Sequence, residues 1–250
     1  MIQGIDKFKE YFKDDMDNYV IIGGLATALI ADDLGFLARA TKDIDLVVIS
    51  KDNEEFIKKL LRFVKEAQYK TKQRTKNDSK HNLFRFLDSE DKTYPEQLEL
   101  FAIHDEDSQI ITDKHIIPIE TPEFYDYLSA ILLDKDYFDL LVNHTANMDG
   151  LHIATAEVLI PLKIHAHLNL VGGIANYNGK HLNDVIRLIS FLDGENKVEL
   201  KGNPKRDFIE FLPIFEEVEE EKINNIFKSM KSSNFSKEDL VELLNYTYSE

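Results

Sequence analysis

The first fifty residues alternate between helical and strand-like patterns of apolar positions. Residues 5–13 have a helical pattern, and the short apolar run YVIIG at residues 19–23 is typical of a strand. Residues 25–33, rich in alanine and leucine, favour a helix. The β-branched run IDLVVI at residues 44–49 favours a second strand. We therefore expect two strands with a helix between them.

The next segment predicts an amphipathic helix followed by a hairpin. Ser50 is expected to cap a helix over residues 51–67, whose apolar side chains recur at helical spacing: Phe56, Leu60, Phe63 and Val64. Strands are expected at residues 81–88 and 97–103, and the turn-rich SEDKTYPE between them suggests an antiparallel hairpin. This order predicts the α+β class, with a mixed sheet and helices packed on it.

The pattern becomes mostly helical after about residue 120. Thr121 followed by Pro122 predicts a helix over residues 122–133. Thr155 opens a second helical stretch, AEVLIPLKIHAHLNL, and the loop VGGIANYNG precedes a third, KHLNDVIRLISFL. Ser236 is expected to cap the last, SKEDLVELLNYTY. We expect a boundary near residue 120, with a sheet-containing domain over residues 1–120 and a mostly helical domain over residues 121–250.

The composition indicates a protein that folds without disulfides and outside a membrane. With 43% hydrophobic residues among 250, the chain can bury a core. No apolar run approaches the roughly 20 residues that span a bilayer, and the N-terminal MIQGIDKFKEYFKDDMDNY lacks the apolar region of a signal peptide. The absence of cysteine excludes disulfides and thiolate metal sites. These features suit the cytoplasm, which is our expectation.

The net charge of −16 is unevenly distributed. Residues 58–85 contain ten Lys and Arg against two acidic residues, a local charge of +8, so the remainder carries −24. A basic segment on an acidic body can bind RNA or an acidic partner. A solvated helix face and loop explains the same segment without a partner.

Two aspartates at the start of the second strand are candidate metal ligands. Asp43 and Asp45 are two residues apart on an extended segment, so both carboxylates project to the same side. They repel each other unless they share a cation, and Mg²⁺ prefers such oxygen ligands. Glu99, flanked by leucines in a later strand, could be a third acid, with Asp88 as the alternative. Two metal ions about 4 Å apart could then clamp the oxygens of a phosphoryl transfer.

Gly23 and Gly24 end the first strand and precede a helix. The lack of Cβ would allow a phosphate to approach the backbone there, and a helix N-terminus offers free N–H donors. Glycines at such positions are also ordinary turn residues. The pair alone therefore leaves both interpretations open.

Lys163 interrupts an apolar helical face, where a buried lysine without an anion would be costly. A nucleotide phosphate could supply that anion. Lys180 and Asp184 are four apart on a helix, and a solvent-exposed ion pair explains them without a function. His165 and His167 point to different faces of their helix, which argues against a joint metal site.

These residues together resemble the nucleotidyltransferase superfamily pattern. That pattern is a glycine pair, an acid-x-acid strand and a third acid on a later strand, as in IIGGLATAL, ARATKDIDLVV and LELF. The chain resembles more closely the AbiEii-like nucleotidyltransferase toxins, whose R-x-T-x-D-I-D signature is similar to Arg39 through Asp45. The family's downstream lysine and Lys-x-x-x-Asp helix match Lys163 and the segment from Lys180 through His181 to Asp184.

The resemblance implies a DNA polymerase β-like fold and transfer of a nucleoside monophosphate from an NTP to a hydroxyl. It implies Mg²⁺, or Mn²⁺, at Asp43, Asp45 and Glu99, with Glu99 also able to activate the acceptor. It implies a triphosphate held by the following residues: Gly23, Gly24, Thr41, Lys163 and Lys180. Asp184 would order the base, the ribose or Lys163. An RNA acceptor resembling tRNA, a toxin role and a cognate antitoxin would follow from the same kinship.

The chain departs from the family pattern at two points. The gap between Gly24 and Asp43 is longer than in the general superfamily, and glutamate stands at position 99 where aspartate is commoner. Three alternatives remain open at this point. They are the same fold acting on a protein hydroxyl, a silent nucleotide- or RNA-binding module, and an interaction protein whose helical half binds an antitoxin.

Overall fold

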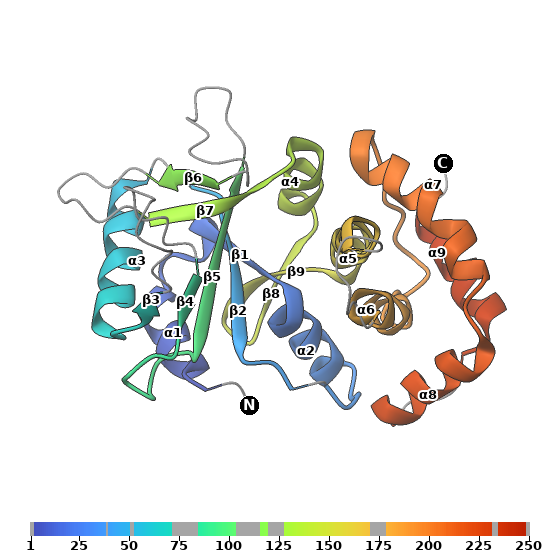
Figure 1. Ribbon diagram of the computed structural model, residues 1–250, viewed down its shortest axis with the longest axis horizontal. Helices are drawn as coiled ribbons and strands as arrows, with labels where there is room; N and C mark the ends of the chain where they lie inside the picture. The colour runs from blue at the N-terminus through green and yellow to red at the C-terminus, as the bar shows by residue number, and fades with distance from the viewer. Residues whose placement is uncertain are drawn as a thin grey trace. The chain divides into compact units, whose positions relative to one another are not determined.

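The computed structural model describes residues 3–38, 40–50, 53–71, 85–103, 116–119, 128–170, 179–231 and 235–248 (Figure 1). The chain divides into two compact units. The first, the sheet unit, comprises Met1–Ala26, Ala40–Phe138 and Thr145–Ile153. The second, the helical unit, comprises Thr27–Arg39, Asp139–His144 and Ala154–Glu250.

The sheet unit is built on one mixed sheet, to which the described residues contribute nine strands. These are β1 (Tyr19–Ile22), β2 (Asp43–Val48), β3 (Lys70–Thr71), β4 (Arg85–Leu87), β5 (Gln97–Ile103), β6 (Ile116–Ile119), β7 (Leu128–Leu133), β8 (Thr145–Met148) and β9 (Leu151–Ala154). The order is β3-β4-β5-β2-β1-β9-β8, with β7 pairing β5 and β6 pairing β7. β1 is antiparallel to β2, β2 is parallel to β5, and β4 is antiparallel to β5. The expected hairpin and mixed sheet are therefore confirmed.

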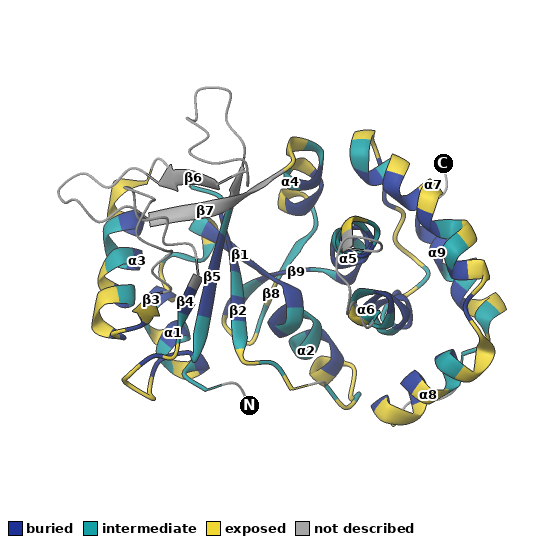
Figure 2. Ribbon diagram, in the orientation of Figure 1, coloured by how far each residue is buried: buried dark blue, intermediate teal, exposed yellow. Residues whose placement is uncertain are grey.

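Aromatic side chains of two helices cover one face of this sheet. α1 (Ile5–Phe12) and α3 (Glu54–Glu66) bring Phe8, Phe12 and Phe63 together, with ring centroids of Phe8 and Phe63 5.7 Å apart. Tyr19 on β1 joins them, 5.6 Å from Phe8, and Phe56 of α3 stacks on Tyr19 at 6.4 Å. Such rings bury large apolar areas (Figure 2). The face that carries Tyr19 is thereby the core face of the sheet unit.

The helical unit contains the helices from α5 onward. They are α5 (Ala156–Leu170), α6 (Lys180–Ile189), α7 (Gly202–Glu216), α8 (Glu220–Met230) and α9 (Lys237–Tyr248). α5 packs on both α6 and α7, and the buried Phe211 and Phe215 of α7 belong to the core of this unit. The remaining described helices are η1 (Met16–Asn18), α2 (Gly23–Asp33) and α4 (Lys135–Val142). Both α2 and α4 span the division between the units.

Two helix starts follow the sequence closely. Thr155 directly precedes α5, and its carbonyl accepts from the backbone N–H groups of Val158 and Leu159. At α9, Ser236 Oγ accepts from the N–H of Asp239 at 3.1 Å, and the Asp239 carboxylate accepts from the N–H of Ser236 at 2.8 Å. This reciprocal pair satisfies two backbone donors that a helix start leaves open. The cap at Ser236 is confirmed.

Three expectations differ from the structure. Residues 128–133, expected as the end of a helix, form β7, because this apolar run pairs with β5 and β6 in the sheet; residues 122–127 lie outside the described residues. α3 is capped by Asn53, whose side chain accepts from the N–H of Phe56 at 3.2 Å, and not by Ser50. The sheet unit extends past the expected boundary near residue 120, because β7, β8 and β9 complete the sheet.

The α+β class, with a mixed sheet and flanking helices, is confirmed. Within the part of the chain that the structure describes, none of the helices has the length and apolarity needed to span a membrane. The stretch of the basic segment at residues 72–84 lies outside the described residues, so its expected contact with RNA stays a prediction.

Asn53→Ala should destabilise the sheet unit by about 1 kcal/mol, because it removes the acceptor for the Phe56 N–H. The same change also removes a hydrogen bond of 2.8 Å to Asn18 Oδ1. Ser50→Ala is the matched control and should change stability by less than about 0.5 kcal/mol. Urea unfolding of both variants measures the difference, and an equal loss in the two would contradict the assignment of the cap.

Candidate functional site

The register of β2 and β5 puts the candidate carboxylates on one face of the sheet. Asp43 lies opposite Gln97, and Asp45 lies opposite Glu99, on parallel neighbouring strands. Side chains alternate along a strand, so these four residues share a face while Ile44 and Leu46 point the other way. Ile44, Leu46, Leu98 and Leu100 are all fully buried. Since Tyr19 pairs with Val48 on the core face, the carboxylates project from the face opposite the aromatic cluster.

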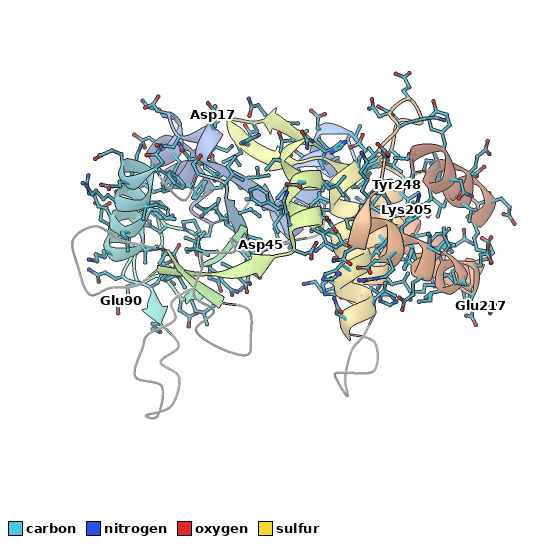
Figure 3. The ribbon with its side chains drawn as sticks, turned by 90° about the horizontal axis from the view of Figure 1, so that it is seen from above. Asp17, Asp45, Glu90, Lys205, Glu217 and Tyr248 are labelled. Atoms are coloured by element: carbon cyan, nitrogen blue, oxygen red, sulfur yellow. The ribbon has the colours of Figure 1, made fainter. Side chains whose placement is uncertain are left out.

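Burial differs along this face. Asp43, Asp45 and Gln97 are partly exposed, whereas Glu99 is 7% exposed. Asp45, which Figure 3 labels, therefore lies beside a buried acid on β5. An acid this deep in a sheet has to be engaged by hydrogen bonds or charge.

Position 23 requires glycine because Asp45 lies against its backbone. Its φ is +70°, a conformation that favours glycine. A Cβ on Gly23 would lie 1.9 Å from Asp45 Oδ2. The carboxylate thus rests against the backbone at the first residue of α2, and no other residue type leaves it that space.

Gly24 has a similar relation to Thr41. A Cβ on Gly24 would lie 2.7 Å from Thr41 Oγ1 and 3.2 Å from Thr41 Cβ. The start of α2 is therefore in close contact with two polar side chains, that of Thr41 just before β2 and that of Asp45 in β2. The backbone N–H groups at this helix start are of the kind that bind phosphate.

Glu99, and not Asp88, shares a strand face with Asp43 and Asp45. Asp88 follows β4, is exposed and has a φ of +50°. In β4 it is Arg85 and Leu87 that lie opposite Glu99 and Gln97, while Phe86 lies opposite Leu98. Asp88 thus lies beyond the end of β4, where its positive φ breaks the strand alternation, whereas the register gives Glu99 the same face as Asp43 and Asp45.

The three acids are suitable Mg²⁺ ligands in their chemistry, since all their donors are oxygens. Within the described part of the chain, no group of three or more His, Cys, Asp or Glu side chains is arranged to hold a metal ion. What the register shows is that the three residues share one face of two neighbouring strands. The metal role of Asp43, Asp45 and Glu99 stays a prediction.

A buried charge cluster forms within the helical unit. Lys163 Nζ lies 3.8 Å from Asp184 Oδ2, and Arg187 Nη1 donates to Asp184 Oδ1 at 3.2 Å. The side chains of Lys163 and Asp184 are 14% and 10% exposed. Asp184 is thus buried, unlike the solvent-exposed partner of Lys180 that the helix spacing suggested. Removing one member of such a pair is costly because the other remains buried and charged.

Sequence reasoning missed Arg187 and the pair formed by His165 and Asp207. Arg187 follows Asp184 by three residues on α6, a spacing that could have indicated the contact. His165 Nδ1 lies 2.6 Å from Asp207 Oδ2 of α7, whereas His167 is buried with its ring 6.0 Å from Phe211. The two histidines therefore lie in different surroundings, and Asp207 could not have been paired with His165 from the sequence.

The structure brings the predicted residues together in two sets. Gly23, Gly24, Thr41, Asp43, Asp45 and Glu99 belong to the sheet unit, and Lys163, Lys180 and Asp184 to the helical unit. Arg39, the first residue of the signature, lies outside the described residues.

Two solved structures are similar to this chain. One is an antigenic nucleotidyltransferase-like protein from Paracoccidioides brasiliensis, with 12% sequence identity and a TM-score of 0.42, over 92% of this chain and 94% of that one. The other is the antibiotic-resistance factor ANT(2'')-Ia, with 15% identity and a TM-score of 0.41, over 85% of this chain and 91% of that one. No family model and no curated protein matches the chain. The functional proposal below therefore rests on the site residues.

Gly24→Ala and Thr41→Ala should be coupled. Gly24→Ala alone should destabilise the sheet unit by about 1–3 kcal/mol, because its Cβ meets Thr41 Oγ1 at 2.7 Å. Thr41→Ala removes that oxygen and should recover part of the loss, which a double-mutant cycle in urea unfolding measures.

A second double-mutant cycle, of Gly23→Ala with Asp45→Ala, provides the comparison for the first. Removing the Asp45 carboxylate relieves the contact but leaves alanine at a φ of +70°, so this pair should recover less. Strict additivity of Gly24→Ala and Thr41→Ala would contradict the close approach.

His181 should contribute to acid sensitivity of the helical unit. Burial, and then the charge of Lys163, lowers the pKa of His181 from 6.5 to about 4. Between these values the unfolded chain binds a proton that the folded chain does not, so stability falls as the pH falls from 6.5 to 4. His181→Gln should flatten the pH dependence of the urea midpoint in this window. An unchanged slope would show that His181 does not titrate in this way.

Proposed function

We propose that this chain is a Mg²⁺-dependent nucleotidyltransferase, which moves a nucleoside monophosphate from an NTP to a hydroxyl of an RNA acceptor. The observation that carries the proposal is the register of β2 and β5, which gives Asp43, Asp45 and Glu99 one common face. The contact of Gly23 with Asp45 supports it, because it puts the start of α2 beside the same acids.

The candidate site residues of the sheet unit have two roles in this proposal, metal binding and triphosphate binding. Asp43 and Asp45 would hold Mg²⁺, together with Glu99, and Mn²⁺ could replace it. The bound ion would neutralise phosphate charge and favour approach of the negatively charged NTP to an acidic surface. The backbone N–H groups at Gly23 and Gly24 and the hydroxyl of Thr41 would hold the triphosphate.

At the α-phosphorus the reaction forms one bond and breaks one, and a proton is transferred. The acceptor hydroxyl oxygen attacks the α-phosphorus, and the bond from that phosphorus to the bridging oxygen of the β-phosphate breaks. Pyrophosphate leaves with the bonding electron pair. The hydroxyl proton passes to the carboxylate of Glu99, which would serve as the base. Aligning the acceptor with the phosphorus lowers the entropic part of the barrier.

The residues of the helical unit would contribute charge. Lys163 would neutralise phosphate oxygens, with Lys180 as a second cation, and Asp184 would orient Lys163. A role as the toxin of a toxin–antitoxin or abortive-infection system, and a cognate antitoxin protein, rest on the resemblance of the signature residues alone.

Asp45→Asn should reduce transfer by at least about 100-fold, the scale seen when a group that stabilises transition-state charge is lost. The measurement is incubation with each α-labelled NTP, Mg²⁺ and total cellular RNA, followed by separation of labelled RNA from labelled protein. EDTA should abolish labelling and added Mg²⁺ should restore it.

Asp33→Asn is the matched control, because Asp33 is an exposed aspartate at the end of α2. It should retain wild-type labelling. Undiminished labelling by Asp45→Asn would falsify the proposed site, and label found in protein would redirect the acceptor to a protein hydroxyl.

A further inference from the structure

Gln97 is a further polar residue on the face that carries the acids. It lies opposite Asp43 on β5, two residues before Glu99, so its side chain shares their face. It is partly exposed, whereas the neighbouring Leu98 on the core side is fully buried. Nothing in the proposed binding of the metal or of the triphosphate uses this amide.

In the proposed reaction, the order of strands indicates on which side of β2 the NTP and the acceptor would bind. β2, with Asp43 and Asp45, lies between β1 and β5. Gly23 and Gly24, where the triphosphate would bind, follow β1 directly. In a displacement at phosphorus, the attacking and leaving oxygens lie on opposite sides of the reacting atom. With the leaving pyrophosphate on the β1 side of the acids, the acceptor enters on the β5 side, where Gln97 and Glu99 lie.

The chemistry of the amide indicates what it would bind. A glutamine side chain has two N–H donors and one carbonyl acceptor and carries no charge. It therefore adds nothing to the charge that holds a cation. A hydroxyl both donates and accepts, so two adjacent hydroxyls match an amide that offers a donor and an acceptor together. Glu99 beside it would take the proton of the hydroxyl that attacks.

We propose that Gln97 is a specificity-determining residue on the acceptor side, where it recognises the second hydroxyl of an acceptor that carries a vicinal diol. The inference rests on the proposed function for the direction of transfer. The terminal ribose of an RNA is one such diol, with the 2′- and 3′-hydroxyls adjacent. An acceptor that lacks the second hydroxyl leaves one hydrogen bond of the amide unmade.

The test compares two short RNA oligonucleotides that differ only in the last sugar, ribose or 2′-deoxyribose. Binding is measured by fluorescence anisotropy with Mg²⁺ and a non-hydrolysable α,β-methylene NTP, and transfer is measured with the α-labelled NTP. Wild-type protein should bind the ribose end about tenfold more tightly, the factor expected for about one net hydrogen bond. In Gln97→Met, which keeps the length of the side chain, the preference should fall to about one, with an unchanged KM for the NTP.

Two further variants separate the possible causes of a change. Glu96→Gln alters the residue just before β5, where Glu96 pairs with Lys42 at 3.0 Å, and should keep the tenfold preference. Gln97→Asn keeps an amide on a shorter side chain and should keep part of it. Thermal unfolding of each variant verifies that it is folded.

The outcomes for the inference and for the proposed function are distinct. Equal binding of the two ends by the wild type, an undiminished preference in Gln97→Met, or a raised KM for the NTP in that variant would each overturn the role of Gln97. Labelling that survives Asp45→Asn would overturn the proposed function. A preference that Gln97→Met abolishes in the binding measurement supports the role of Gln97 even then, because binding does not depend on turnover.

Discussion

The parallel pairing of β2 with β5 is the constraint on which the candidate site depends. Six residue pairs, from Asp43 with Gln97 to Val48 with Ala102, fix the register. A slip of β5 by one residue against β2 would turn Glu99 into the aromatic core and bring Leu98 to the face that carries Asp45. The burial of the leucines and isoleucine on the core face therefore also holds the acids in place on the opposite face. The hydrophobic effect thereby fixes the face from which the acids project.

The glycine pair belongs to the same constraint. Gly23 follows β1, which is paired with β2 so that Ile22 lies opposite Asp45. The start of α2 is thus carried to the acids by the antiparallel pairing, and the missing Cβ atoms let Asp45 and Thr41 approach its backbone. The sequence indicated that glycine would matter at this turn. That the approaching groups are a carboxylate and a hydroxyl of the protein itself follows only from the pairing.

Local patterns predicted much of the fold, and long-range pairing explains the rest. The strands at Tyr19 and Asp43, the hairpin before Glu99 and the cap at Ser236 depend on neighbouring residues, and each was predictable. β7 was not, because LSAILL has the apolar run of a buried strand and of a helix alike, and pairing with β5 decides between them. Asn53 and Ser50 are both good caps, and the helix begins three residues later than Ser50 allows. For the candidate site, the alternation along β2 predicted one face for Asp43 and Asp45, but the choice of Glu99 over Asp88 needed the register of a third strand.

The helical unit places an anion beside the buried Lys163. Asp184 forms ion pairs with both Lys163 and Arg187, so the three charged side chains together have a net charge of +1. A protonated His181 would add a second, and burial together with Lys163 lowers the pKa of His181 to about 4, which keeps the imidazole neutral near pH 7. The pair with Asp184 thus avoids the cost of a lysine buried apart from any anion.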